Sequence, residues 1–130
     1  MLRTQKGFTL AELMITIVIL GVLGGIALPR FFPQQEKARV AEAVAMLSAI
    51  RQGEVAYALE HNGVYLQPAN AADWQVLGID TPGGVFIYVV DAQGNATAQR
   101  VGGGANYNGT TIILNINGTW GAGTHPFSPT

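Results

Sequence analysis

The most conspicuous pattern in the chain is an almost wholly apolar run from Phe8 to Leu28, 21 residues long. As a helix it would measure about 31 Å, close to the thickness of the hydrocarbon core of a bilayer. Arg3 and Lys6 precede the run, and basic residues on this flank favour a cytoplasmic N-terminus. An ordinary secretory signal has a shorter apolar core. The pattern therefore predicts a single-pass transmembrane helix.

From about Gln34 to His61, apolar residues recur mostly at spacings of three and four, at Val40, Val44, Leu47, Val55 and Leu59. This period predicts an amphipathic helix. Charged residues, Glu54 among them, supply the polar positions, and Gly53 is a weak point in the pattern. Asn62-Gly63 is a suitable C-cap. We expect Phe8 to about His61 to form nearly one long helix, bent near Pro29.

The pattern then changes to short apolar runs separated by turn residues. Asn70 is predicted to cap a short helical turn that extends to Gly78. Three of these runs predict strands: Val85–Val90, Ala96–Val101 and Thr111–Ile116. Asn117-Gly118 follows the last run and is a hairpin signal. The predicted fold is α+β, with the long N-terminal helix packed on a small antiparallel sheet of three or four strands.

Composition narrows the choice of partners. The chain has 130 residues, a net charge of −1 and no cysteine. No strongly basic face indicates nucleic acid, so none is predicted as a partner. A small domain without disulfides must be held by packing and by contacts between subunits, or it works in a compartment where disulfides are not made.

Glu12 breaks the apolar run near its start. A carboxylate at the centre of a bilayer costs roughly 2.5 kcal/mol or more, and such groups usually have a partner. No basic residue lies within the run. A cut between Gly7 and Phe8 would create an α-amino group one helical turn before Glu12, able to pair with it in the same chain or in a neighbouring subunit. The alternative is that Glu12 lies at headgroup depth without a partner.

The stretch Lys6-Gly7-Phe8-Thr9-Leu10-Ala11-Glu12-Leu13-Met14 resembles the class III signal of type IV pilins and type II secretion pseudopilins. The resemblance implies that a prepilin peptidase cuts between Gly7 and Phe8 and methylates the new terminus at Phe8. It also implies that Glu12, together with Phe8, serves in assembly. Ala11 departs mildly from the family pattern, which usually has Ile there.

Gly21, Gly24, Gly25 and Pro29 weaken the second part of the apolar run as a helix. The family is thought to melt its helix near this proline inside the filament, which gives one hypothesis for these residues. The alternative hypothesis is close packing of neighbouring helices through small side chains.

Catalytic chemistry is not indicated by the remaining residues. There is no nucleophile arrangement or phosphate loop, so the chain is predicted not to be an enzyme, and no cofactor is expected. His61 and His125 are isolated, so no metal site is predicted. Three sequons, at Asn95, Asn108 and Asn117, lie at predicted turns and are interpreted as turn residues.

These observations predict four segments: leader peptide 1–7, transmembrane and assembly helix 8–28, amphipathic half 29–61, and globular part 62–130. The predicted function is a structural subunit of a type IV pilus-like filament. Its expected partners are copies of itself, prepilin peptidase and the assembly machinery of the inner membrane. The precursor would span the inner membrane once, with its globular part outside the cytoplasm. Two alternatives remain, a pseudopilin of a type II secretion system and a membrane-anchored binding module.

Overall fold

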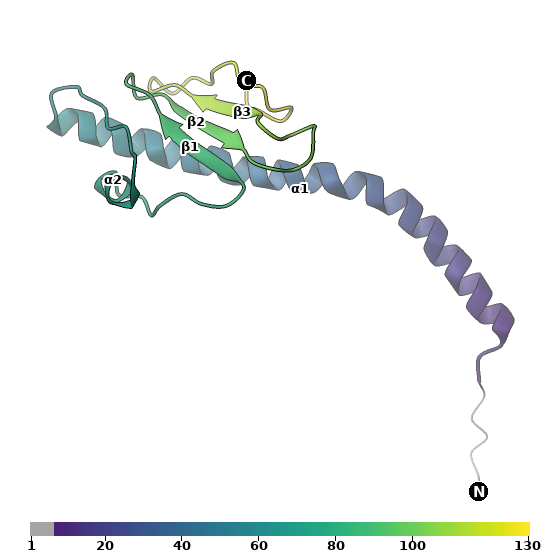
Figure 1. The fold of residues 1–130 in the computed structure, drawn as a ribbon. Helices are drawn as coiled ribbons and strands as arrows, with labels where there is room; N and C mark the ends of the chain where they lie inside the picture. The colour runs from purple at the N-terminus through teal and green to yellow at the C-terminus, as the bar shows by residue number, and fades with distance from the viewer. Residues whose placement is uncertain (1–6) are drawn as a thin grey trace, which may run out of the picture. The chain divides into compact units, whose positions relative to one another are not determined.

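A single helix, α1, covers Leu10–Glu60 and contains 51 residues (Figure 1). It covers both predicted helical segments except for Phe8 and Thr9 at the start and His61 at the end, which were predicted to be helical and are not. The computed structural model describes residues 7–130, apart from the side chains of residues 28–30. The predicted leader residues 1–6 and the side chain of Pro29 therefore lie outside the described residues. The backbone of residues 28–30 is α-helical, so α1 continues through Pro29, and the bend predicted there stays a prediction.

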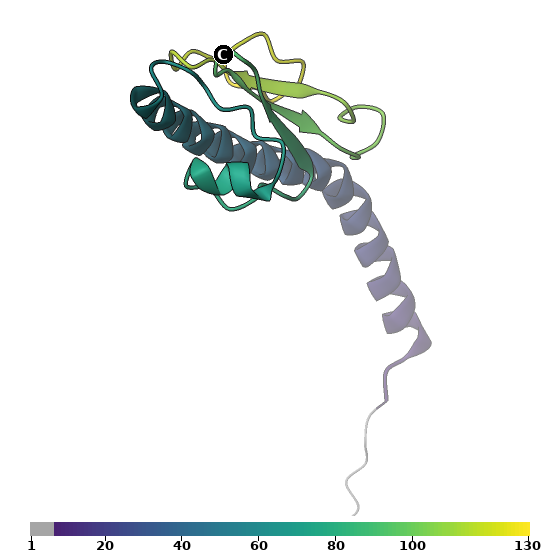
Figure 2. The same ribbon diagram turned by 60° about the vertical axis from the view of Figure 1, so that its left-hand side comes forward.

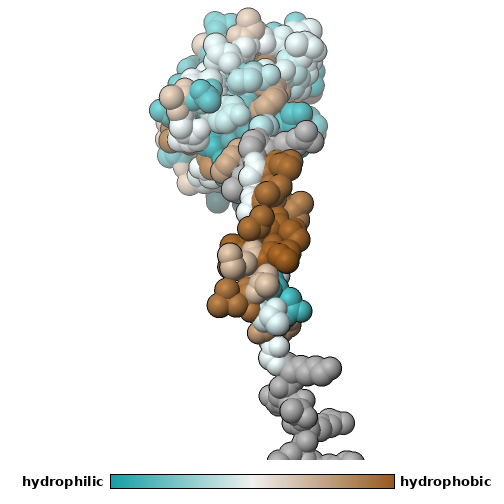
Figure 3. Space-filling view, turned by 90° about the vertical axis from the view of Figure 1, so that its right-hand side faces the viewer, coloured by the Kyte–Doolittle hydropathy of each residue, from teal (hydrophilic) through white to brown (hydrophobic). Residues whose placement is uncertain are grey.

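The chain divides into two compact units, Met1–Glu36 and Lys37–Thr130. In the first unit, the segment Leu10–Ala27 of α1 is long and apolar enough to cross a membrane. Its large apolar side chains are exposed on every side, and Figure 3 shows them gathered along this part of the helix. A helix that is apolar all round needs lipid or other protein to cover it.

The second unit is built around a three-stranded antiparallel sheet (Figures 1 and 2). Its strands are β1 at Phe86–Val90, β2 at Ala96–Arg100 and β3 at Thr111–Leu114, in that spatial order. In the register, Tyr88 lies opposite Ala98, which lies opposite Ile112. The predicted fourth strand is reduced to one bridge between Leu114 and Trp120. The prediction of an α+β fold with a small antiparallel sheet is confirmed.

The core of this unit lies between one face of α1 and one face of the sheet. Four residues of α1 at spacings of three and four are buried and face the sheet: Val40, Ala43, Leu47 and Ile50. The predicted apolar period was right for Val40 and Leu47 but wrong for Val55 and Leu59, which are exposed because the sheet and the segments after it do not cover that side of the helix. Alternate residues of the strands meet them, since the side chains of a strand point to opposite faces in turn: Phe86, Val90, Ala96, Ala98, Ile112 and Leu114.

The C-terminal tail covers one edge of the sheet. The backbone N–H of His125 donates to the carbonyl of Thr111, and that of Gly121 donates to the carbonyl of Ile113. The hydroxyl of Thr124 accepts a hydrogen bond from the N–H of Thr111 at 2.9 Å. The tail is irregular, yet it satisfies the outer polar groups of β3 that would otherwise be left open.

Helix α2, Ala71–Val76, begins at the predicted cap. The side chain of Asn70 accepts from the N–H of Asp73, and the Asp73 carboxylate accepts from the N–H of Asn70, so both halves of a capping box are present. The residue after α2, Leu77, packs directly on Gly53 of α1. A Cβ atom built at Gly53 would lie 2.6 Å from the Leu77 carbonyl oxygen.

Glu54, next to Gly53, is buried, although the sequence pattern placed it among the polar positions of α1. Its Oε2 accepts a hydrogen bond from the N–H of Leu66 at 2.9 Å, which ties the segment after α1 to the helix. Its Oε1 has no hydrogen-bond partner among the described residues. Burial raises the pKa of this carboxyl, and the Leu66 bond offsets the rise only in part.

Replacing Gly53 by Ala should destabilise the second unit by about 1–3 kcal/mol, because the added methyl overlaps the Leu77 carbonyl. This outcome opposes helix propensity, which favours Ala by about 1 kcal/mol. Urea unfolding followed by tryptophan fluorescence measures it. Gly25→Ala is the matched control, since nothing lies within 4 Å of its added Cβ. A Gly53→Ala chain as stable as the parent would contradict the close contact.

The free energy of unfolding should fall as pH rises above about 4.3, the ordinary pKa of a glutamate. The raised pKa of Glu54 means that the folded chain holds this proton more tightly than the unfolded chain. Its stabilising effect is therefore complete at low pH and is lost as pH rises through the raised pKa. Glu54→Gln should flatten this part of the pH profile. Parallel profiles for the two chains would show that Glu54 is not responsible.

Candidate functional site

The start of α1 brings together the residues that the sequence analysis singled out. Residues 7–9 are not helical, and the helix begins at Leu10. The carbonyl of Thr9 accepts the backbone bond from Leu13 at 3.3 Å, so Thr9 is the N-cap residue. The Gly7–Phe8 peptide bond therefore lies just outside the helix, and Glu12 lies in its first turn.

The carboxylate of Glu12 has a partner in its own chain. Its Oε2 accepts hydrogen bonds from the N–H of Thr9 at 2.8 Å and from the Thr9 hydroxyl at 3.0 Å. In return, the N–H of Glu12 donates to the Thr9 hydroxyl oxygen at 3.3 Å. This reciprocal pair is a capping box, which satisfies donors that the first turn of a helix leaves open.

The second carboxylate oxygen of Glu12, Oε1, has no hydrogen-bond partner among residues 7–130. The side chain is also exposed. The negative charge lies at the N-terminal end of a helix dipole, which stabilises it. The capping box therefore holds the carboxylate by one oxygen and leaves the other able to accept a donor from another molecule.

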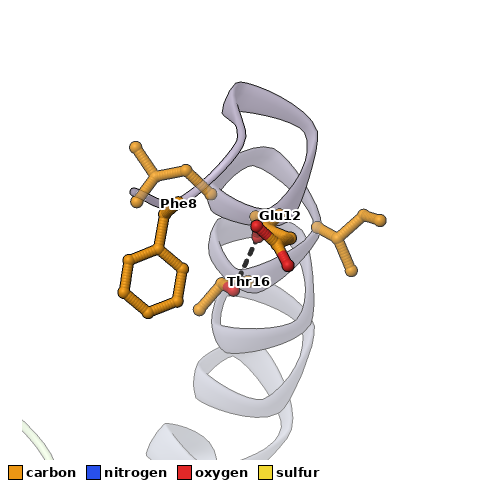
Figure 4. A pocket seen from close by; sticks show the side chains of 5 residues that line it. Phe8, Glu12 and Thr16 are labelled. Atoms are coloured by element: carbon orange, nitrogen blue, oxygen red, sulfur yellow. Dashed lines mark hydrogen bonds between the residues drawn. The ribbon is translucent and has the colours of Figure 1, made fainter. Parts of the chain in front are cut away.

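A hollow lies beside Glu12 on the surface of the helix. Five residues line it: Phe8, Glu12, Leu13, Ile15 and Thr16. Figure 4 shows the labelled side chains of Phe8, Glu12 and Thr16 around this hollow. The hydroxyl of Thr16 donates to the Glu12 carbonyl at 2.7 Å, drawn as the dashed line, so this hydroxyl is satisfied within the helix. The hollow is mostly apolar, and the Glu12 carboxylate at its rim carries the charge.

Gly7 and Phe8 make few contacts with the rest of the described chain. No heavy atom lies within 4 Å of a Cβ built at Gly7, and the side chain of Phe8 is 90% exposed. A larger residue at position 7 would therefore fit in the free chain. Any requirement for glycine at this position must come from another molecule.

The three predicted glycines of the apolar segment lie within regular helix. Nothing in the chain is within 4 Å of a Cβ built at Gly21, Gly24 or Gly25. No contact within the single chain therefore requires a residue as small as glycine at these positions. Neighbouring helices or a change of conformation in a filament would have to supply that role, so both hypotheses for these residues stay predictions.

Thr9 is the residue of this site that the sequence analysis missed. The signal was present, because Thr-x-x-Glu before an apolar run is the pattern of a capping box. From the sequence, two states were expected for Glu12: pairing with a new Phe8 terminus, or no partner at all. The structure shows a third, in which the unprocessed chain already satisfies one oxygen of Glu12 through Thr9.

The other polar residues discussed in the sequence analysis have local structural contacts. His125 is buried, stacks on Tyr107, and accepts the N–H of Phe127 through Nδ1. The amide of Asn95 bonds to Asp91 and to the N–H of Ile116, as expected of a turn residue. No group of three or more metal-binding side chains is found among the described residues.

Comparison with known proteins bears on the same segment. The family model described as the prokaryotic N-terminal methylation motif matches residues 2–28. The chain carries the prepilin-type methylation motif. This stretch contains Gly7, Phe8, Thr9 and Glu12, so the match covers the whole site at the start of α1.

Similarity to pilins extends beyond the motif. The chain is 36% identical to the type IV major pilin protein PilE1 of Neisseria gonorrhoeae, over 78% of this chain and 47% of that protein. It is 33% identical to a fimbrial protein of Neisseria meningitidis, over 78% of this chain and 59% of that protein. A Pseudomonas aeruginosa fimbrial protein is 39% identical over 45% of this chain. The chain is thus homologous to type IV pilins, and it spans about half the length of these Neisseria relatives.

Proposed function

We propose that this chain is a structural subunit of a type IV pilus-like filament. The observation that carries the proposal is the arrangement at the start of α1. A potential cleavage point lies outside the helix, and a carboxylate with one open oxygen lies one turn further along an exposed apolar helix. The similarity to pilins and fimbrial proteins supports the same function. Pilins are structural proteins, so no enzymatic activity is proposed.

Before assembly, the chain would be stored in the inner membrane through the first part of α1. Prepilin peptidase would cut between Gly7 and Phe8 and methylate the new terminus. The capping box would keep Glu12 satisfied in the stored subunit, because the Thr9 hydroxyl and N–H remain after the cut. The second unit, Lys37–Thr130, would lie outside the cytoplasm.

During assembly, the charged terminus of Phe8 would enter an apolar surrounding among the helices of other subunits. A charge buried without a partner is strongly destabilising, while a charge with a well-placed partner is not. The open Oε1 of Glu12 in an adjacent subunit can supply that partner without breaking the Thr9 bonds. Because helices in a slipped register leave both charges unpaired, the pair would select one axial register.

Two alternative functions, a membrane-anchored binding module and a pseudopilin, differ from a pilus subunit in what they require of α1. A membrane-anchored binding module has no need of Glu12 in its helix, and it gives no role to the methylation motif. A pseudopilin of a secretion system would use the same start of α1. The curated names of the relatives reported above are those of pilins and fimbrial proteins, so we favour a filament on the cell surface.

In cells that carry the native processing machinery, the N-terminal peptide from membranes should begin at methylated Phe8. Gly7→Val should leave a peptide that begins upstream of Phe8. Valine fits at this position in the free chain, so the substitution should impair only cleavage by the peptidase. Mass spectrometry of the N-terminal peptide measures both. A parent peptide that retains Met1 would contradict the proposed processing.

Glu12→Leu and Glu12→Ala should leave the amount of chain in membranes unchanged and should reduce sheared filament by about tenfold or more, since one unpaired buried charge costs several kcal/mol. Glu12→Gln keeps the capping box but not the charge, so it should also impair assembly. Normal filament yield from the Leu or Ala variant would exclude charge pairing as the basis of assembly.

A further inference from the structure

Helix α1 begins at Leu10, and the sequence before it opposes helix only through the low helix propensity of Gly7. Phe8 is apolar, and no proline precedes the helix to end it. The contacts that fix the boundary are those of the capping box between Thr9 and Glu12. Side chains with a suitable oxygen at the N-cap hold that residue in a non-helical conformation while the helix starts after it.

The capping box determines the state of the bond that would be cut. Within the described residues, nothing donates a hydrogen bond to the carbonyl of Gly7, and Phe8 is almost fully exposed. In a helix that continued through this point, the same carbonyl would accept the N–H of Ala11, and it would be enclosed by the turns on either side. The non-helical conformation leaves the carbonyl open to attack.

We propose that Thr9 is a positioning residue for processing: its capping box with Glu12 ends α1 at Leu10 and presents the Gly7–Phe8 peptide bond to prepilin peptidase in a non-helical conformation. This inference rests on the proposed function. In the reaction itself, water adds to the Gly7 carbonyl, the bond to the Phe8 nitrogen breaks, and that nitrogen takes up a proton. Thr9 touches none of these atoms and acts only through the conformation of the chain.

The size of the effect follows from the strength of a cap. Loss of an N-cap side chain costs a helix start about 1 kcal/mol, which corresponds to about fivefold in an equilibrium. If the helix can extend toward Gly7, the fraction of chain in the cleavable conformation falls, and the apparent affinity of the peptidase falls by the same fraction. We therefore expect kcat/KM to fall. A digestion followed only to its endpoint would conceal this, because slowly cut chains are also cleaved in the end.

The test is the initial rate of cleavage of the full-length chain in mixed lipid and detergent micelles by purified prepilin peptidase. Thr9→Val keeps the shape of the side chain but removes its hydroxyl, and it should lower kcat/KM by up to about fivefold, the limit reached when the helical state predominates in the variant. Thr9→Ser and Thr9→Asn both retain a good N-cap oxygen, and they should cleave within about twofold of the parent.

Thr9→Asn separates conformation from direct recognition. Asparagine differs from threonine in shape but caps a helix equally well, so a peptidase that reads the Thr9 side chain itself would cut this variant as slowly as Thr9→Val. That result would overturn the inference. Equal rates for Thr9→Val and the parent would overturn it as well.

A second measurement follows the conformation directly. Backbone chemical shifts of Phe8 in the uncut chain should move toward helical values in Thr9→Val and remain unchanged in Thr9→Asn. Unchanged shifts in Thr9→Val would contradict the proposed role of the cap. A parent chain that an active peptidase does not cut would instead contradict the proposed function. Tryptophan fluorescence of each variant verifies that the second unit is folded.

Discussion

A carboxylate in an apolar helix must have hydrogen-bond partners, and this constraint shapes the functional part of the molecule. Glu12 meets it within its own chain, because Thr9 donates two hydrogen bonds to one carboxylate oxygen. The same bonds end the helix at Leu10 and leave the second oxygen open. The start of the helix and the state of the Glu12 carboxylate therefore depend on one local interaction. In the proposed function, the same interaction would also keep the charge satisfied in the membrane and leave one oxygen for a neighbouring subunit.

The second unit meets a different constraint, since it has no cysteine and a small core. Its stability depends on how closely the segment after α1 is held to that helix. Gly53 allows the carbonyl of Leu77 to approach, and Glu54 accepts the N–H of Leu66 from inside the core. The bond to Leu66 buries both carboxylate oxygens of Glu54, and Oε1 has no hydrogen-bond partner among the described residues. This burial is destabilising, because a buried polar atom without a partner loses its hydration.

Patterns that depend on neighbours in sequence were predicted well. The apolar run and the amphipathic period predicted α1, and Asn70 was predicted as the cap of α2. The sheet was also predicted, although β1, β2 and β3 are each one or two residues shorter than their apolar runs. The last hairpin closes with one bridge to Trp120, since the tail beyond it turns to satisfy the edge of β3.

Contacts between distant segments could not be read from the pattern. Glu54 fits the polar positions of an amphipathic helix, and only the fold places Leu66 over it and buries it. His125 is isolated in sequence, yet the loop that carries Tyr107 meets the tail and encloses it. Thr9 is the opposite case, because its capping box is purely local and could have been predicted from Thr-x-x-Glu. Processing between Gly7 and Phe8 stays a prediction, and both residues lie within the matched methylation motif.

We propose that on assembly Glu12 keeps its hydrogen bonds to Thr9 and gains a new partner through its open oxygen. A cryo-electron microscopy map of the assembled filament that resolves side chains would decide this. We expect that Oε2 still accepts from Thr9 and that Oε1 lies within about 4 Å of the Phe8 terminal nitrogen of an adjacent subunit. A filament in which that nitrogen has another partner, or in which Glu12 faces no neighbouring terminus, would exclude the proposed pair.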